Sequence, residues 1–117
     1  MKKNILKEKS YSFALRIVKL SRYLVGELKE FVLAKQVLRS GTSIGANIEE
    51  AYQGESKVDF IHKLSIANKE AFETHYWVRL LRDSRLLTTI QAESLLSECD
   101  ELQRMLIAAI KTAKARR

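Results

Sequence analysis

Apolar residues recur at every third or fourth position along most of the chain, a spacing that predicts amphipathic helices. We predict helices over residues 7–26, 30–52 and 57–84, and a fourth that begins at Thr88 and continues to the C-terminus. Their apolar stripes are Phe13, Ile17, Leu20, Leu24 and Leu28; Val37, Gly41, Ile44, Ile48 and Ala51; Phe60, Leu64, Ala67, Ala71, Val78 and Leu81; and Ala92, Leu95, Cys99, Leu102, Leu106, Ala109 and Ala113. Nothing in the sequence reads as a strand.

Residues at the predicted helix ends fit these boundaries. Gly26 is a candidate C-cap for the first helix, and Gly54 offers a stop for the second. The segment from Ser56 to Asp59 is typical of a capping box before the third helix. Thr88 and Gln91 have the same spacing at the start of the fourth. The chain contains no proline, so it has few strong helix breakers.

Four helices of roughly 20–28 residues with short connections predict an all-α protein, an antiparallel up-down-up-down four-helix bundle about 35 Å long. The length of 117 residues fits a single domain that spans the whole chain, 1–117. The third helix also carries apolar residues away from its main stripe, which indicates a second neighbour such as another subunit. These residues are Ile61, Ile66, Phe72, Tyr76, Trp77 and Leu80.

Positive charge is in excess and unevenly distributed. The net charge is +7 and the isoelectric point is about 9.7. In the predicted topology, the start of the first helix, the turn after the second and the end of the fourth share one pole. Lysines and arginines gather there, although Glu49, Glu50, Glu55 and Asp59 compensate part of their charge. An excess of this kind favours anionic partners such as nucleic acid.

The candidate nucleic-acid-binding residues are cations of the first and fourth helices and of the segment before the first helix. They would neutralise phosphates without reading a sequence, so binding should depend strongly on salt. The set is Lys2, Lys3, Lys7, Lys9, Arg16, Lys19, Arg22, Lys111, Lys114, Arg116 and Arg117. The competing interpretation is that these basic helix ends only keep the protein soluble.

Catalytic and metal chemistry find little support. Cys99 falls on an apolar stripe, where a buried and inert thiol is expected. His62 follows Asp59 at the spacing of one metal-binding motif, but a ferritin-like bundle needs two Glu-x-x-His motifs. We therefore expect no enzyme activity, no metal and no cofactor. A single cysteine and the lack of a long apolar run predict a cytoplasmic protein with no membrane partner.

The segment from Arg39 to Ala51 places small and polar residues where a packing helix would normally carry Leu or Val. Gly41 and Gly45 lie on one helix face and indicate a close approach of another helix. If the third helix folds back on the second, Arg39 should pair with Glu73. We expect Ser43 and Asn47 to make hydrogen bonds to the neighbouring helix. In the alternative, Arg39 and Asn47 face a ligand or RNA.

Several residues of the second and third helices resemble the four-helix-bundle family of ribosomal-RNA intervening-sequence proteins, small bacterial proteins. Some of them are encoded inside insertions in large-subunit ribosomal RNA genes. The resemblance runs from about Phe13 to Leu106 and is most specific from Ser43 to Ala51. The matching residues are Gln36, Arg39, Ser43-Ile44, Asn47-Ile48, Glu50, Phe60, Ile66-Ala67 and Glu73.

The sequence also departs from the family pattern. Glu49 and Ala51 replace the usual alanine and glycine, Gly45 stands where proline is frequent, and Glu70 replaces a serine. The resemblance implies an antiparallel bundle that assembles as a homopentamer. It also implies kinship with the accessory protein of diversity-generating retroelements, a basic pentamer that binds nucleic acid and a reverse transcriptase. It implies no established enzyme activity.

Two hypotheses follow. In the first, the chain is a non-catalytic homo-oligomer, a pentamer by resemblance, that associates with nucleic acid, RNA in preference to DNA. In the second, it is a protein-interaction scaffold or accessory subunit that does not touch nucleic acid. Arg39, Ser43, Asn47, Glu50 and Glu73 serve as structural motif positions in either case.

Overall fold

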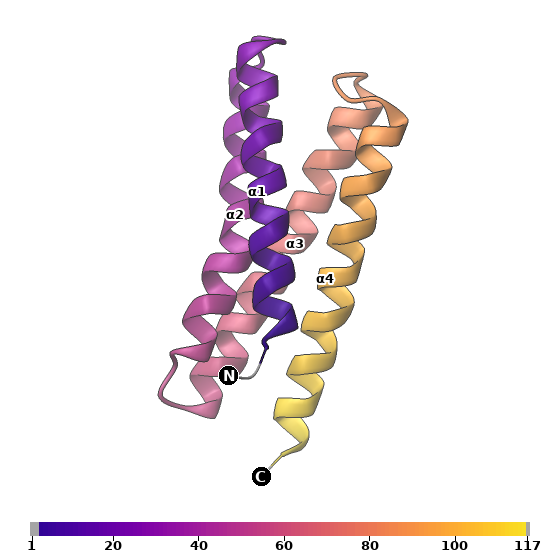
Figure 1. Cartoon of the computed structure of the whole chain (residues 1–117). Coiled ribbons are helices and arrows are strands. Elements are labelled where there is room, and N and C mark those ends of the chain that lie inside the picture. Colours follow the sequence, from indigo (N-terminus) through magenta and orange to yellow (C-terminus); the bar gives the residue numbers. More distant parts are fainter. Residues whose placement is uncertain (1–2, 117) are drawn as a thin grey trace.

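Four helices form the computed structural model, which describes residues 3–116. α1 is Ile5–Gly26, α2 is Phe31–Tyr52, α3 is Lys57–Asp83 and α4 is Thr89–Ala115. Successive helices run antiparallel and pack side by side, and α4 returns beside α1 (Figure 1). The predicted all-α, up-down-up-down bundle is confirmed, and each helix boundary lies within two residues of its predicted position.

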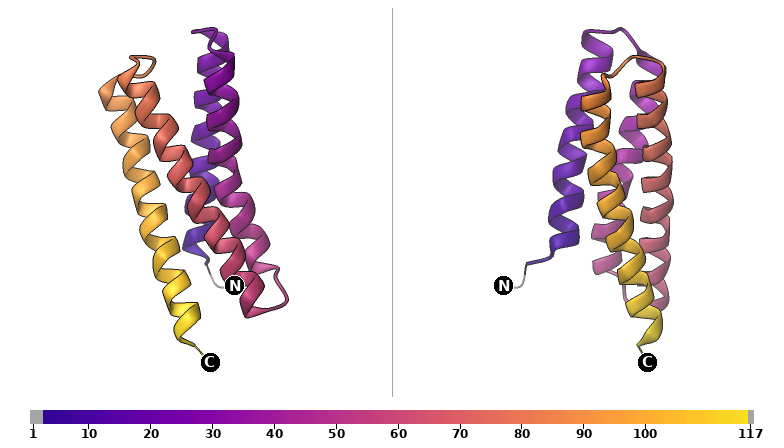
Figure 2. Two further views of the ribbon diagram at one scale, coloured as in Figure 1. Left: turned by 180° about the vertical axis from the view of Figure 1, so that it is seen from behind. Right: turned by 90° about the vertical axis from the view of Figure 1, so that its right-hand side faces the viewer.

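The helices occupy the four corners of the bundle. α1 and α3 lie diagonally opposite, with α2 between them on one side and α4 on the other (Figure 2). The outward faces of α1 and α3 therefore point in opposite directions. The molecule measures 49 × 25 × 20 Å. It is longer than predicted because the helices are offset along the bundle axis, and α4 continues past the start of α1 (Figure 1).

The predicted apolar stripes meet in the centre of the bundle. Phe13, Ile17, Ile44, Leu64 and Leu106 are fully buried. Burial of these faces is the main force that holds the four helices together. Leu28 is the exception to the predicted stripe of α1, because it lies in the turn after the helix and stays exposed.

Side-chain caps explain where the helices begin. The Ser56 hydroxyl accepts a hydrogen bond of 3.0 Å from the Asp59 amide at the start of α3. At the start of α4, Thr88 accepts from the Gln91 amide and the Gln91 side chain accepts from the Thr88 amide, which completes a capping box. Such caps satisfy amides that have no partner within the helix. The predicted capping box is therefore confirmed at Thr88, whereas at Ser56 only the hydroxyl bond of the predicted box is present.

The end of α1 differs from the prediction. Gly26 is the last helical residue, and Glu27 takes the C-cap position in ordinary right-handed geometry. The left-handed backbone conformation falls instead on Lys29, with φ of 55°. Its ammonium donates a hydrogen bond of 3.0 Å to the Gly26 carbonyl oxygen, which stabilises the turn. The turn after α1 therefore does not require a glycine at position 26.

Gly41 and Gly45 let α1 and α2 approach closely, as predicted. A β-carbon at Gly41 would lie 2.7 Å from Cγ1 of Ile17, and one at Gly45 would lie 3.4 Å from the Ser10 carbonyl oxygen. Both glycines are buried between the two helices. Close backbone packing compensates for the low helix propensity of glycine.

The seam between α1 and α4 is looser than the other three. These two helices make the fewest contacts of the four neighbouring pairs. Ion pairs join them instead, between Lys9 and Glu101 at 3.0 Å and between Arg16 and Glu98. No helix within residues 3–116 is long and apolar enough to cross a membrane.

Candidate nucleic-acid interface

One pole of the bundle gathers the start of α1, the α2–α3 turn and the end of α4, as the topology predicted (Figure 1). Lys3, Lys7 and Lys9 come to this pole from α1 or the residues just before it. Lys111, Lys114 and Arg116 reach it from the end of α4 or the residue just after it. Lys2 and Arg117 lie outside the described residues. This arrangement concentrates charge from both ends of the chain.

Three of the candidate cations are held by carboxylates of neighbouring helices. Lys7 lies 3.3 Å from Glu49, Lys9 lies 3.0 Å from Glu101, and Arg16 pairs with Glu98. A cation that is already neutralised offers less to a phosphate than a free one. Lys7, Lys9 and Arg16 therefore act mainly as links between helices in the isolated chain.

Cations at the end of α4 are free of such partners. Lys111 and Lys114 are exposed, and neither has a carboxylate within ion-pair distance among residues 3–116. Arg104 is also exposed and has no carboxylate partner among residues 3–116. It precedes Lys111 by seven residues and Lys114 by ten, and this spacing places the three cations on one helix face. Sequence reasoning missed Arg104, although this spacing was readable in the sequence. We name Arg104, Lys111 and Lys114 the α4 basic stripe.

The end of α4 is fixed against the start of α3. The Lys57 ammonium donates a hydrogen bond to the Arg116 carbonyl oxygen. Tyr52 and Phe60 meet edge to face with their centroids 5.2 Å apart, and they line a hollow together with residues of α4. The α4 basic stripe therefore belongs to a helix whose end is held against α2 and α3.

The remaining candidates on α1 lie away from the pole. Lys19 and Arg22 belong to the last two turns of α1, at the opposite end of the bundle from Lys111. Arg16 stands between the two ends. The structure thus brings together the cations of the chain termini and separates them from Lys19 and Arg22.

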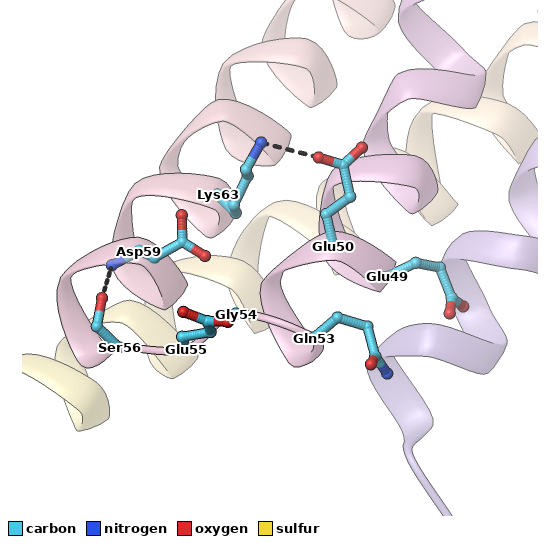
Figure 3. A pocket seen from close by; sticks show the side chains of 8 residues that line it. All are labelled: Glu49, Glu50, Gln53, Gly54, Glu55, Ser56, Asp59 and Lys63. Carbon is cyan, nitrogen blue, oxygen red and sulfur yellow. Dashed lines mark hydrogen bonds and ion pairs between the residues drawn. The ribbon is translucent and has the colours of Figure 1, made fainter.

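An acidic hollow occupies the α2–α3 turn at the same pole. It has a volume of about 680 Å³, and its carboxylates are those of Glu49, Glu50, Glu55 and Asp59 (Figure 3). The Lys63 ammonium lies 2.8 Å from Glu50, and this hydrogen bond raises the pKa of Lys63. The sequence predicted compensation at the pole, and the pairs of Lys7 with Glu49 and of Lys63 with Glu50 provide it.

Arg39 of α2 joins two carboxylates of α3. Its guanidinium lies 3.3 Å from Glu70 and also pairs with Glu73, as predicted for Glu73. The Trp77 indole donates a second hydrogen bond of 2.9 Å to Glu73. Glu70, which departs from the family pattern, therefore contributes a further pair. Arg39 faces these carboxylates, so its guanidinium is engaged within the chain.

The predicted hydrogen bonds between helices from Ser43 and Asn47 are wrong. The Ser43 hydroxyl donates to the Arg39 carbonyl oxygen at 2.7 Å, and the Asn47 amide donates to the Ser43 carbonyl oxygen at 2.8 Å. Both bonds stay within α2, because a carbonyl four residues back is always within reach of a short polar side chain. A buried hydrogen bond of 2.9 Å between the hydroxyls of Ser40 and Thr74 joins α2 and α3 instead.

Cys99 is fully buried in the core, as expected. Its thiol donates a hydrogen bond of 3.2 Å to the Ala71 carbonyl oxygen. Burial, and after it the charge of Asp100, raise the pKa of the thiol to about 12. A thiol that stays protonated is a poor nucleophile.

His75 is engaged on the surface between α3 and α4. Its Nε2 lies 3.1 Å from the Asp100 carboxylate, and its Nδ1 accepts a hydrogen bond of 3.0 Å from Arg79. Within residues 3–116, no three or more His, Cys, Asp and Glu side chains converge as metal ligands would.

Comparisons with known proteins agree with this architecture. The family model described as 23S rRNA-intervening sequence protein matches residues 2–108. A crystal structure of a protein with unknown function from the S23 ribosomal protein family of Bacteroides thetaiotaomicron is 55% identical, with a TM-score of 0.92. The match covers 95% of this chain and 99% of that one. No curated protein matches. The chain belongs to the family of 23S rRNA-intervening sequence proteins.

Proposed function

We propose that this protein is a non-catalytic, homo-oligomeric and cytoplasmic protein that associates with nucleic acid, RNA in preference to DNA. Contacts are electrostatic and run along the phosphate backbone. The observation that carries the proposal is the α4 basic stripe, where Arg104, Lys111 and Lys114 are exposed on one helix face without a carboxylate partner. Residues 104–117 contain no acidic residue at all.

Free cations matter because binding to nucleic acid gains most of its free energy from released counterions. A lysine that leaves an existing ion pair to meet a phosphate gains less, because it exchanges one anion for another. Lys7 and Lys9 are in that position. The proposed footprint therefore centres on the end of α4, and the acidic hollow of the α2–α3 turn marks a side of the pole that repels phosphate.

The family name supports RNA as the preferred nucleic acid, since it refers to intervening sequences of 23S rRNA. Helical RNA exposes phosphates and 2′-hydroxyls, and its narrow major groove keeps side chains from reading bases. A helix surface with free cations suits recognition of that kind, by shape and charge. Little discrimination among RNA sequences is expected.

Self-association strengthens such weak contacts. The resemblance to the family implies five subunits, and each subunit would bring its own α4 basic stripe to one ligand. Linked sites bind together with much higher avidity than each alone. Binding by the assembly would then be tight even though a single stripe holds few cations.

A titration by fluorescence anisotropy tests the proposal. Nuclease-treated protein is added to a labelled, structured fragment of 23S rRNA and to DNA of the same sequence, over a series of salt concentrations. The proposal predicts binding that weakens steeply with salt and favours RNA. Absence of binding to either at low salt, or binding unchanged at high salt, would contradict it.

The alternative function is a protein-interaction scaffold or accessory subunit. The exposed aromatic residues Phe72 and Tyr76 favour it, since their rings lie on the outside of α3. A defined protein partner recovered after nuclease treatment, together with no affinity for RNA, would support this alternative over the first.

A further inference from the structure

An aromatic hollow lies at the pole where the end of α2, the start of α3 and the end of α4 meet (Figure 1). Tyr52 and Phe60 line it from α2 and α3, and the small residues Ala109 and Ala113 line it from α4. Its volume is about 310 Å³. Small-molecule sites usually measure about 300–1,000 Å³, so this hollow suits one small flat group.

We propose that the aromatic hollow binds one unpaired base of an RNA strand whose phosphates are held by the free cations at the end of α4. This inference rests on the proposed association with RNA and adds which part of the RNA the protein recognises. The α4 basic stripe meets phosphates, which every paired helix also offers. A base bound in the hollow makes the protein prefer RNA that has unpaired nucleotides.

Tyr52 supplies the ring for this contact. It is the last residue of α2, and its side chain is 41% exposed. Phe60 meets it edge to face, with the two rings inclined at 78°, and packs against the core. In such a pair Phe60 covers at most one face of the Tyr52 ring. Proteins commonly hold unpaired bases by stacking them on an aromatic face of this kind.

The α4 side of the hollow suits a flat base as well. Ala109 and Ala113 are one helical turn apart, and their methyl groups leave the surface of α4 low. Thr112 lines the hollow beside them. Its hydroxyl can both donate and accept a hydrogen bond, so it serves the edge of any base. The hollow therefore distinguishes unpaired from paired nucleotides without selecting one base.

The charges around the aromatic hollow suit a phosphate chain. Arg116 lines it, and the Arg116 guanidinium has no carboxylate within ion-pair distance among residues 3–116. No acidic side chain of the described chain lines it either. Lys111 and Lys114 stand on another face of the same two turns of α4. A strand that crosses the end of α4 therefore meets the α4 basic stripe and then the hollow.

Three labelled RNA hairpins test the inference by fluorescence anisotropy at one salt concentration. The first is fully paired, the second carries a single bulged adenosine, and the third carries an abasic nucleotide at the bulge. The last two have the same number of phosphates, so only the base differs. We expect the adenosine bulge to bind about five- to a hundredfold more tightly than the other two, the gain from stacking one base.

Variants of Tyr52 separate stacking from packing of the core. Tyr52→Leu keeps an apolar side chain but removes the ring, so it should abolish the preference for the adenosine bulge. Tyr52→Phe keeps the ring and should retain the preference. Tyr23→Leu is the matched control, because Tyr23 is 39% exposed and lies near the other end of the bundle. Circular dichroism and the melting temperature verify that each variant is folded.

The possible failures are distinguishable. Equal affinity of the wild-type protein for all three hairpins would overturn the inference but leave the proposed function standing, because phosphate contacts alone would then explain binding. Absence of binding to any hairpin would overturn both. A preference that survives Tyr52→Leu would place the base elsewhere and contradict the inference. So would an unchanged preference with a changed mass in light scattering, which would show that a second copy of the chain covers the hollow.

Discussion

Ser40 of α2 and Thr74 of α3 form a hydrogen bond of 2.9 Å between their hydroxyls inside the apolar core. Both side chains are fully buried, and Thr74 interrupts an otherwise apolar stripe. The Thr74 hydroxyl also lies 2.8 Å from the Glu70 carbonyl oxygen, so it has two partners. A pair of this kind favours one register of the two helices, because a shift by one turn would break the bond and leave each buried hydroxyl with only a carbonyl oxygen of its own helix.

Thr74→Val keeps the volume of the side chain but removes the hydroxyl that Ser40 contacts. We expect the free energy of unfolding to fall by about 1 kcal/mol, the net contribution of a buried hydrogen bond, because the Ser40 hydroxyl keeps only the Val37 carbonyl oxygen at 3.5 Å. Ser40→Ala combined with Thr74→Val should cost less than the sum of the two single changes, because both changes remove the same hydrogen bond. Urea unfolding of the four proteins measures this coupling. Strictly additive effects would show that the hydrogen bond contributes nothing.

Gly41 and Gly45 should respond in opposite ways to alanine. At Gly41 the new methyl would meet the stiff, branched side chain of Ile17 at 2.7 Å, so Gly41→Ala should destabilise the protein. At Gly45 the nearest atoms are at 3.4 Å, and Gly45→Ala should leave stability unchanged or raise it by up to about 1 kcal/mol through helix propensity. Thermal unfolding of both variants tests the contrast, and an equal loss at both sites would contradict it.

Arg39 should contribute to stability through the two carboxylates of α3. Its side chain is about half exposed, so solvent screens the charges and we expect Arg39→Ala to cost about 1 kcal/mol. Arg39→Lys should recover only part of this, because an ammonium cannot hold Glu70 and Glu73 in the same geometry. Trp77 shares Glu73, so its fluorescence should change too. An unchanged melting temperature and emission spectrum for Arg39→Ala would contradict this role.

The buried thiol of Cys99 makes stability depend on pH in the alkaline range. Its pKa is raised from 9.0 to about 12 in the folded protein. Above pH 9 the unfolded chain loses the thiol proton while the folded chain keeps it, so the unfolded state binds fewer protons and stability falls as pH rises. We expect the free energy of unfolding to fall by about 1.4 kcal/mol per pH unit because of this group. Cys99→Ala should remove that slope, measured by urea unfolding from pH 8 upwards; an identical slope in both proteins would exclude Cys99 as its source.

The fold was predictable because it depends on features that a sequence displays directly. The stripe from Val37 to Ala51 repeats every three or four residues, and Thr88 with Gln91 signals where α4 begins. Arg39 and Glu73 were predictable as a pair because folding one helix back on the other brings them level. Each of these inferences needs only helix periodicity and topology.

The site was less predictable because several side chains have more than one possible hydrogen-bond or ion-pair partner of similar energy. Ser43 and Asn47 could donate to another helix or to the carbonyl oxygen four residues back, and in the structure both donate to the carbonyl oxygen within α2. Lys7 and Lys9 looked as free as Lys111, yet neighbouring carboxylates hold them. Side-chain direction around each helix decides such outcomes, and the number of charges at a pole does not reveal it.

Two double variants of equal charge, compared in the RNA titration, separate the role of the free cations from that of the paired ones. Lys111→Gln with Lys114→Gln removes two free cations, whereas Lys7→Gln with Lys9→Gln removes two that are already paired. We predict that the first weakens binding and lowers the slope of log affinity against log salt by about two per subunit engaged, while the second changes both far less. Equal effects of the two variants, or no effect of the first, would show that the free cations of α4 do not carry the binding of nucleic acid.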